Sequence, residues 1–92
     1  MAKRLLIEGL VQGVGYRYAF AERAAALGLA GWVRNRSSGA VEASVHGPAD
    51  AVQSIIDWSH KGPSAARVSN VHVADDTEPA PPGATFDIRP TV

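Results

Sequence analysis

The sequence contains no cysteine. This absence excludes disulfide bonds, thiolate metal ligands and a cysteine nucleophile, and it fits a protein of the reducing cytoplasm. Long apolar runs are also missing: the run that begins at Leu5 is interrupted at Glu8, whereas a bilayer crossing needs roughly 18 to 20 apolar residues. No small-residue cleavage site follows that run. We therefore expect a soluble cytoplasmic protein with neither a signal peptide nor a membrane anchor.

The chain has no excess of positive or negative charge, because nine lysines and arginines balance nine aspartates and glutamates. A balanced chain has no broad positive field with which to hold a nucleic acid or an anionic membrane. It also lacks the basic and aromatic run that RNA-binding modules place on their central strands. Its 92 residues are expected to form a single domain, 1–92, and nothing in them requires more than a monomer. Any anion site must therefore be local.

Short apolar or alternating segments predict the strands. They are expected at residues 5–11, 32–35, 41–45 and 68–73, with a short last strand at 86–88. A serine-serine-glycine sequence lies between the second and third of these segments. Because it supplies turn chemistry, the two segments should form an antiparallel hairpin.

Two further stretches have the spacing of helices. An alanine-rich stretch predicts a helix over 18–27, which Gly28 ends. A second helix should open near Pro48 and end before Pro63. The resulting order, βαββαβ, is that of an α+β ferredoxin-like sandwich, with a four-stranded antiparallel sheet and two helices on one face.

The segment between the first strand and the first helix is the most informative chemically. It reads Val11-Gln12-Gly13-Val14-Gly15-Tyr16-Arg17. A helix N-terminus presents unpaired N–H groups and a positive dipole end, and glycines let successive amides curl around an anion. The guanidinium of Arg17 would add a fork that matches two phosphoryl oxygens. The segment therefore predicts a phosphate site.

The pattern alone also allows purely structural interpretations of these residues. A glycine-x-glycine sequence is more often only a tight turn, with Arg17 as a solvated charge, and Asn35 would only end its strand or form an Asx turn. Two common phosphate motifs are excluded. No Gly-x-x-x-x-Gly-Lys-Ser/Thr run is present, and Tyr18 stands where a dinucleotide fingerprint needs glycine or alanine.

A family resemblance bears on this choice. Gly9-Leu10-Val11-Gln12-Gly13-Val14-Gly15-Tyr16-Arg17 closely resembles the first signature of the acylphosphatase family. The second signature of that family is resembled by two further segments, Gly31-Trp32-Val33-Arg34-Asn35 and Gly39-Ala40-Val41-Glu42. The likeness covers nearly the whole chain, with two departures: Leu10 stands where many relatives have arginine, and Ser38 where many have aspartate. The expected βαββαβ order agrees with the fold of that family.

The resemblance implies hydrolysis of acyl phosphates to a carboxylate and inorganic phosphate by direct attack of water. It implies that the phosphoryl group is bound by Arg17 and by the backbone amides of residues 12–17, and that Asn35 orients the water. The phosphate-binding residues would be Gln12, Gly13, Val14, Gly15, Tyr16 and Arg17, and the catalytic pair Arg17 and Asn35. Inorganic phosphate should inhibit competitively, because the product leaves from the same phosphate cradle, which is the loop of residues 12–17 with the guanidinium of Arg17.

We expect no cofactor and no metal, because His46, His60 and His72 make no metal-binding pattern. The serines show no arrangement with a base that would make one of them a nucleophile. Two alternatives to a free-standing enzyme are a non-catalytic phosphate-binding or ligand-binding regulatory domain, and the acylphosphatase-like domain of a carbamoyl-transfer protein. A regulatory binder would need the cradle but not Asn35, so the presence of both favours catalysis.

Two aromatic residues and two arginines are expected to have structural roles only. Trp32 and Phe86 are expected in the core. Arg34 and Arg36 should project to the face opposite Asn35, as surface charges, because side chains alternate along a strand.

Overall fold

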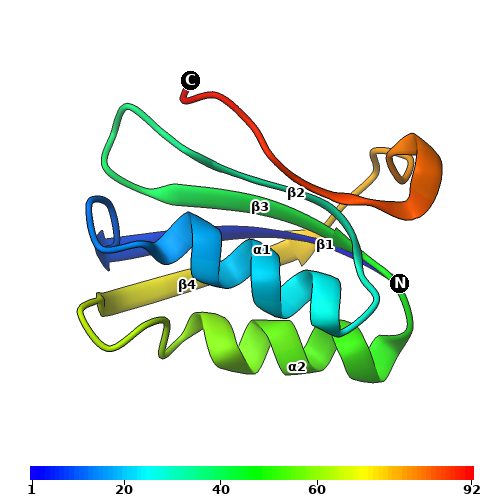
Figure 1. The fold of residues 1–92 in the computed structure, drawn as a ribbon, viewed down its shortest axis with the longest axis horizontal. Coiled ribbons are helices and arrows are strands. Elements are labelled where there is room, and N and C mark those ends of the chain that lie inside the picture. Colours follow the sequence, from blue (N-terminus) through cyan, green and yellow to red (C-terminus); the bar gives the residue numbers. More distant parts are fainter.

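The computed structural model describes all 92 residues as two layers, with a sheet on one side and two helices packed on one of its faces (Figure 1). The elements, in chain order, are β1 (Ala2–Leu10), α1 (Tyr16–Ala26), β2 (Ala30–Asn35), β3 (Val41–His46), α2 (Ala49–Ser59), β4 (Arg67–Asp75), a 3₁₀ turn (Pro82–Ala84) and β5 (Phe86–Ile88). The α+β ferredoxin-like arrangement expected from the sequence is confirmed. No helix is both long enough and apolar enough to cross a membrane.

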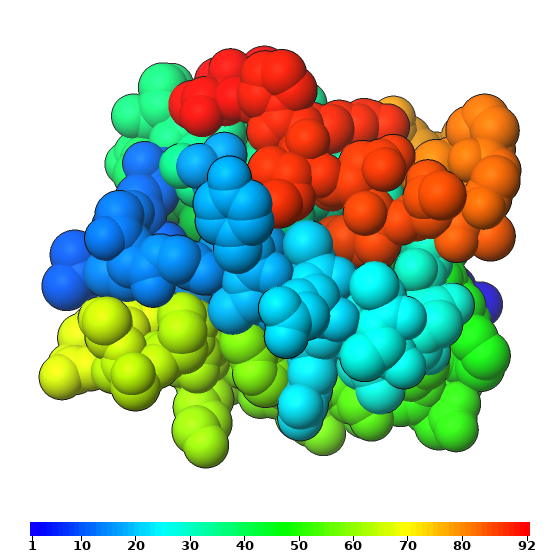
Figure 2. All heavy atoms as spheres, in the orientation of Figure 1, coloured from blue at the N-terminus to red at the C-terminus, as the bar shows by residue number.

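The sheet differs from the expected one in strand number and direction. It has five strands in the order β4-β1-β3-β2-β5, and β5 pairs in parallel with the edge of β2, so that Gly31 lies opposite Phe86. A purely antiparallel sheet of four strands was therefore wrong. The physical reason is the aromatic ring of Phe86, which packs 5.7 Å from the ring of Phe20 and holds β5 against α1. In Figure 2 the last segment of the chain, in orange and red, lies beside the blue and cyan atoms of α1.

The core lies between the helices and the sheet. Leu5 and Ile7 of β1 are fully buried there, as expected of residues two apart on one face of a strand. The alternation ends at Gly9, which is exposed, where the pairing with β4 shifts in register. Phe20 of α1 and Ile55 of α2 are also fully buried and close the core from the helical side. An aromatic group continues this contact, with the ring of Trp58 5.9 Å from that of Phe20. Both helices are thus held by apolar burial against one face.

Helix α1 begins at Tyr16, two residues earlier than the sequence suggested. Gly15 caps it in a left-handed conformation, with φ of 77°, and the carbonyl of Gly15 accepts a hydrogen bond from the amide of Ala19 at 3.1 Å. Glycine adopts this conformation without steric cost. Tyr16 and Arg17 therefore lie in the first helical turn, next to the positive end of the helix dipole.

The other face of the sheet is not covered by helices. Trp32 is buried there, but against the planes of three guanidinium groups, with the carbons of Arg4, Arg34 and Arg89 at 5.0, 4.5 and 4.8 Å from its ring centre. Trp32 is therefore not part of the helix-covered core, whereas Phe86 packs against that core as expected. Cation–π contact accounts for a buried indole on an otherwise charged face.

Glu42 joins the charges of this face. Arg34 donates to its carboxylate at 2.8 Å, and Arg36 and Arg4 each donate at 3.2 Å. Burial alone would raise the pKa of Glu42, but these bonds outweigh it and the pKa is lowered. Arg34 and Arg36 are therefore bound in an ion-pair network and are not freely solvated charges.

Candidate active site

A pocket of about 210 Å³ lies where the loop after β1 meets the N-terminus of α1 and the end of β2. It is lined by Val11, Gln12, Gly13, Gly15, Tyr16, Arg17, Tyr18 and Asn35. The loop after β1 and the hairpin between β2 and β3 lie far apart in the sequence but at the same end of the molecule (Figure 1), and Asn35 is the last residue of β2. The structure thus brings together Arg17 and Asn35. Of the six residues expected to bind phosphate, only Val14 does not line the pocket.

The loop presents its backbone amides without internal partners. None of the N–H groups of residues 12–17 donates to an acceptor within the chain. Gly13 and Gly15 have φ of 74° and 77°, and a Cβ on either would meet nothing within 4 Å. Glycine is required here by the backbone conformation and not by crowding. A run of unpaired amides at a helix N-terminus is suited to bind an anion.

The side chain of Gln12 holds this loop to the β2–β3 hairpin. Its Nε2 donates to the carbonyl oxygen of Arg36 at 2.8 Å and to that of Ala40 at 2.9 Å. Both donors of Nε2 are therefore occupied, so the donor that Gln12 can still offer a ligand in the pocket is its backbone N–H. Because the same hairpin carries Asn35, these two bonds link the two halves of the pocket.

Tyr16 anchors the loop on the opposite side. Its hydroxyl donates to the carbonyl oxygen of Ser59 at 2.7 Å, and its ring lies 5.6 Å from that of Trp58. Burial raises the pKa of Tyr16 far above its ordinary value. The tyrosine hydroxyl is thus committed to α2 and stays protonated, and it is not available to react.

Arg17 is the cation of the pocket. Arg4, Arg34 and Arg36 each pair with a carboxylate, whereas Arg17 forms no ion pair. It is half-buried in the first turn of α1, beside the unpaired amides. A guanidinium without a carboxylate partner keeps all its donors for a ligand.

Asn35 supplies the only buried side-chain nitrogen or oxygen atom without a hydrogen-bond partner, its Oδ1. The strand holds it firmly, since Asn35 pairs with Val41 of β3 and its backbone carbonyl accepts from the amide of Val92 at 3.3 Å. No side-chain hydrogen bond of an Asx turn is present. A buried acceptor left unpaired costs about 1 to 3 kcal/mol, which a donor entering the pocket would offset. The carbonyl oxygen of Asn35 is therefore suited to hold a water or another donor.

One serine cluster resembles a catalytic arrangement but lacks the geometry for it. Ser44 lies 3.0 Å from Nε2 of His46 and donates its proton to the carboxylate of Asp76. Burial alone would raise the pKa of Asp76, but the bonds from Ser44 and Arg4 outweigh it and lower the pKa. Ser44 is fully buried, and its hydroxyl proton is engaged by the carboxylate of Asp76, which also accepts from Arg4, so the three groups form a structural hydrogen-bond network. No three histidine, aspartate or glutamate side chains gather as metal ligands.

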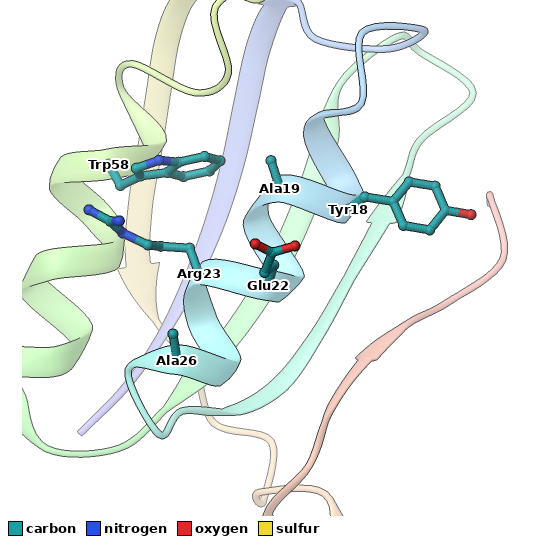
Figure 3. A pocket seen from close by; sticks show the side chains of 6 residues that line it. All are labelled: Tyr18, Ala19, Glu22, Arg23, Ala26 and Trp58. Carbon is teal, nitrogen blue, oxygen red and sulfur yellow. The ribbon is translucent and has the colours of Figure 1, made fainter.

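A larger hollow of about 470 Å³ lies between α1 and α2 (Figure 3). It is lined by Tyr18, Ala19, Glu22, Arg23, Ala26 and Trp58. Although larger, it contains neither unpaired loop amides nor Arg17 or Asn35, so the smaller pocket is the better candidate for chemistry. Tyr18 lines both hollows. The sequence did not assign it to a site, and its only signal was its position directly after Arg17.

Comparison with known proteins identifies similar sequences and structures. Residues 3–88 match the family model described as Acylphosphatase. A curated relative from Acidovorax sp. (strain JS42), named Acylphosphatase, is 52% identical over 92 residues, covering 100% of this chain and 93% of that protein. The crystal structure of acylphosphatase from Bacillus subtilis is 35% identical with a TM-score of 0.86, covering 96% of this chain and 97% of that chain.

A third similarity is to a much longer protein. The structure of full-length HypF in its phosphate- and nucleotide-bound form is 27% identical with a TM-score of 0.84. The match covers 98% of this chain but 12% of that one. The fold therefore occurs both in small proteins and as one part of a large one.

Proposed function

This chain belongs to the acylphosphatase family, and from that premise we propose how its own residues carry out the reaction. Its activity is the hydrolysis of acyl phosphates to a carboxylate and inorganic phosphate. One observation supports the proposed mechanism: the residues that line one pocket include loop residues with unpaired amides, an arginine without an ion pair and an asparagine whose buried Oδ1 has no partner. The first two suit a phosphoryl group, and the third suits a water.

In the proposed binding step, the phosphoryl oxygens are held by the amides of residues 12–17 and by the guanidinium of Arg17. As phosphoryl transfer reaches its transition state, negative charge spreads over the three equatorial oxygens. Donors fixed in a loop and a helix terminus need no rearrangement as that charge develops. The cradle is therefore expected to bind the transition state more strongly than the ground state.

In the proposed chemical step, Oδ1 of Asn35 accepts one hydrogen of a water and directs the water oxygen at phosphorus. An amide is a poor proton acceptor, so Asn35 aims the water without deprotonating it. A bond forms between the water oxygen and phosphorus, and the bond from phosphorus to the acyl oxygen breaks. The electron pair leaves with the carboxylate, and the two water protons remain with the phosphate, which departs as dihydrogen phosphate. A carboxylate is a stable leaving group, so no general acid is needed.

Steady-state hydrolysis of acetyl phosphate and benzoyl phosphate tests this proposal. Purified protein is expected to release phosphate from both compounds, equally well with and without a chelator, and inorganic phosphate should inhibit competitively. Phosphate binding without turnover would favour a non-catalytic binding domain. Noncompetitive inhibition would contradict departure of the product from the same cradle.

We further propose that residues 1–92 act as a single domain and as a monomer in the cytoplasm. The absence of cysteine suits a reducing compartment, and every group of the proposed mechanism comes from one chain. Sedimentation equilibrium at the concentration of the assay and fractionation of cells test these two points. A dimer in the assay, or recovery of the protein outside the cytoplasm, would contradict them.

A further inference from the structure

Tyr18 offers exposed apolar surface at the rim of the proposed active-site pocket. The residue is 71% exposed, while Val11 in the same lining is buried. The other side chains of the lining are absent or committed: the glycines have none, Gln12 bonds the hairpin, and Tyr16 bonds α2. No other lining residue combines a large apolar side chain with exposure to solvent.

The direction of the Tyr18 ring separates it from the hollow between the helices. In Figure 3 the ring points away from α2, while the side chains of Arg23 and Trp58 lie on the α2 side. Tyr18 follows Arg17 directly on α1, so its backbone is fixed next to the guanidinium that is proposed to hold the phosphoryl group. A rigid helix therefore places an aromatic ring at the edge of a polar phosphate pocket.

The substrate requires a surface of this kind. When the phosphoryl group is held by the loop amides and the guanidinium of Arg17, the acyl group must point away from these donors, toward the mouth of the pocket. Of the hydrophobic residues in the lining, Val11 and Tyr16 are buried, so Tyr18 alone offers an exposed ring there. Aromatic side chains bind flat apolar groups by offset or edge-to-face packing. An exposed tyrosine adds a hydroxyl that stays in water while its ring face receives the ligand.

We propose that Tyr18 forms an acyl subsite, which favours acyl phosphates with a flat, apolar acyl group over those with a small one. This inference rests on the proposed function, since it assumes that the phosphoryl group is bound by the adjoining cradle. It names a specificity determinant for the acyl end of the substrate, which the phosphate-binding loop itself does not recognise.

The test compares benzoyl phosphate with acetyl phosphate in wild type, Tyr18→Ala and Tyr18→Phe. Tyr18→Ala should lower the ratio of kcat/KM for benzoyl over acetyl phosphate about three- to tenfold, which corresponds to loss of one aromatic contact. Tyr18→Phe keeps the ring and should keep the ratio. Glu22→Ala, an exposed residue on the same helix that lines only the other hollow, is the matched control and should also keep it.

Inorganic phosphate has no acyl group and provides the internal reference. Its inhibition constant should be the same for wild type and Tyr18→Ala. An unchanged benzoyl-to-acetyl ratio in Tyr18→Ala would overturn the acyl subsite. So would an equal weakening of both substrates and of phosphate, because Tyr18 would then act on the cradle.

Failure of the proposed function is distinguishable from failure of this inference. If wild type hydrolyses neither compound, the proposed function is refuted, but binding of benzoylphosphonate and acetylphosphonate can still be measured by calorimetry. The acyl subsite predicts that wild type prefers benzoylphosphonate and that Tyr18→Ala loses this preference. Equal binding of the two phosphonates by wild type would contradict it.

Discussion

Asn35→Ala should separate activity from stability. The substitution removes Oδ1, which the proposal gives to the attacking water and which has no partner within the protein. Loss of one preorganised hydrogen bond to a reacting group lowers kcat by a factor on the order of 10² to 10³, or about 2.7 to 4 kcal/mol. We expect a reduction of this size in kcat, with KM little changed, because the phosphoryl contacts remain.

The effect on folding should have the opposite sign. A buried acceptor without a donor costs about 1 to 3 kcal/mol, so removing it should leave the free energy of unfolding unchanged or raise it. For a domain of this size, each kcal/mol corresponds to a shift in Tm of about 4 to 8 °C. A loss of turnover caused by unfolding would instead lower Tm.

The assay pairs kcat with thermal unfolding followed by circular dichroism. Asn70→Ala is the matched control, since Asn70 lies exposed on β4, far along the chain from the pocket residues, and should leave kcat unchanged. Near-normal kcat in Asn35→Ala would refute the role of Asn35 in orienting water. A fall in Tm of several degrees would refute the argument that Oδ1 of Asn35 is buried without a hydrogen-bond partner.

The remaining predictions concern binding, the loop and pH. Arg17→Gln should raise KM and lower kcat, together by on the order of a hundredfold or more, while Arg23→Gln, on the same helix but outside the pocket, should change neither. Gln12→Ala removes the two bonds to the hairpin and should lower kcat without abolishing phosphate binding, as measured by competitive inhibition. Glu42 has a lowered pKa in the folded protein, so its contribution to stability is present above its ordinary pKa and is lost as pH falls below it. Glu42→Gln should therefore lower Tm at pH 7 and weaken the loss of Tm between pH 7 and acid, and an unchanged pH profile would contradict this.

Local patterns in the sequence predicted the elements that local physics determines. The alternation of β1, the alanine-rich helix ended at Gly28 and the hairpin turn at Gly39 all depend on residues that are neighbours in the chain. The family resemblance then selected Arg17 and Asn35 as a pair, and the structure brings both into one pocket. Their roles in catalysis stay predictions.

Features that depend on distant contacts were not predicted. The three residues of β5 carry no signal of direction, and their parallel pairing with β2 depends on where the preceding loop delivers the ring of Phe86. Two further features depend on side chains that meet only after folding. They are the hydrogen bonds from Gln12 to the hairpin and the packing of three guanidinium groups around Trp32.

The central claim is that one pocket binds phosphate through the loop and orients water through Asn35. Titration of wild type and Asn35→Ala with inorganic phosphate, followed by the amide resonances of residues 12–17, tests it most directly. The account predicts saturable shifts of these amides with the same Kd in both proteins, although Asn35→Ala has lost turnover. Amides that do not respond to phosphate, or a Kd that weakens in Asn35→Ala as much as kcat falls, would contradict it.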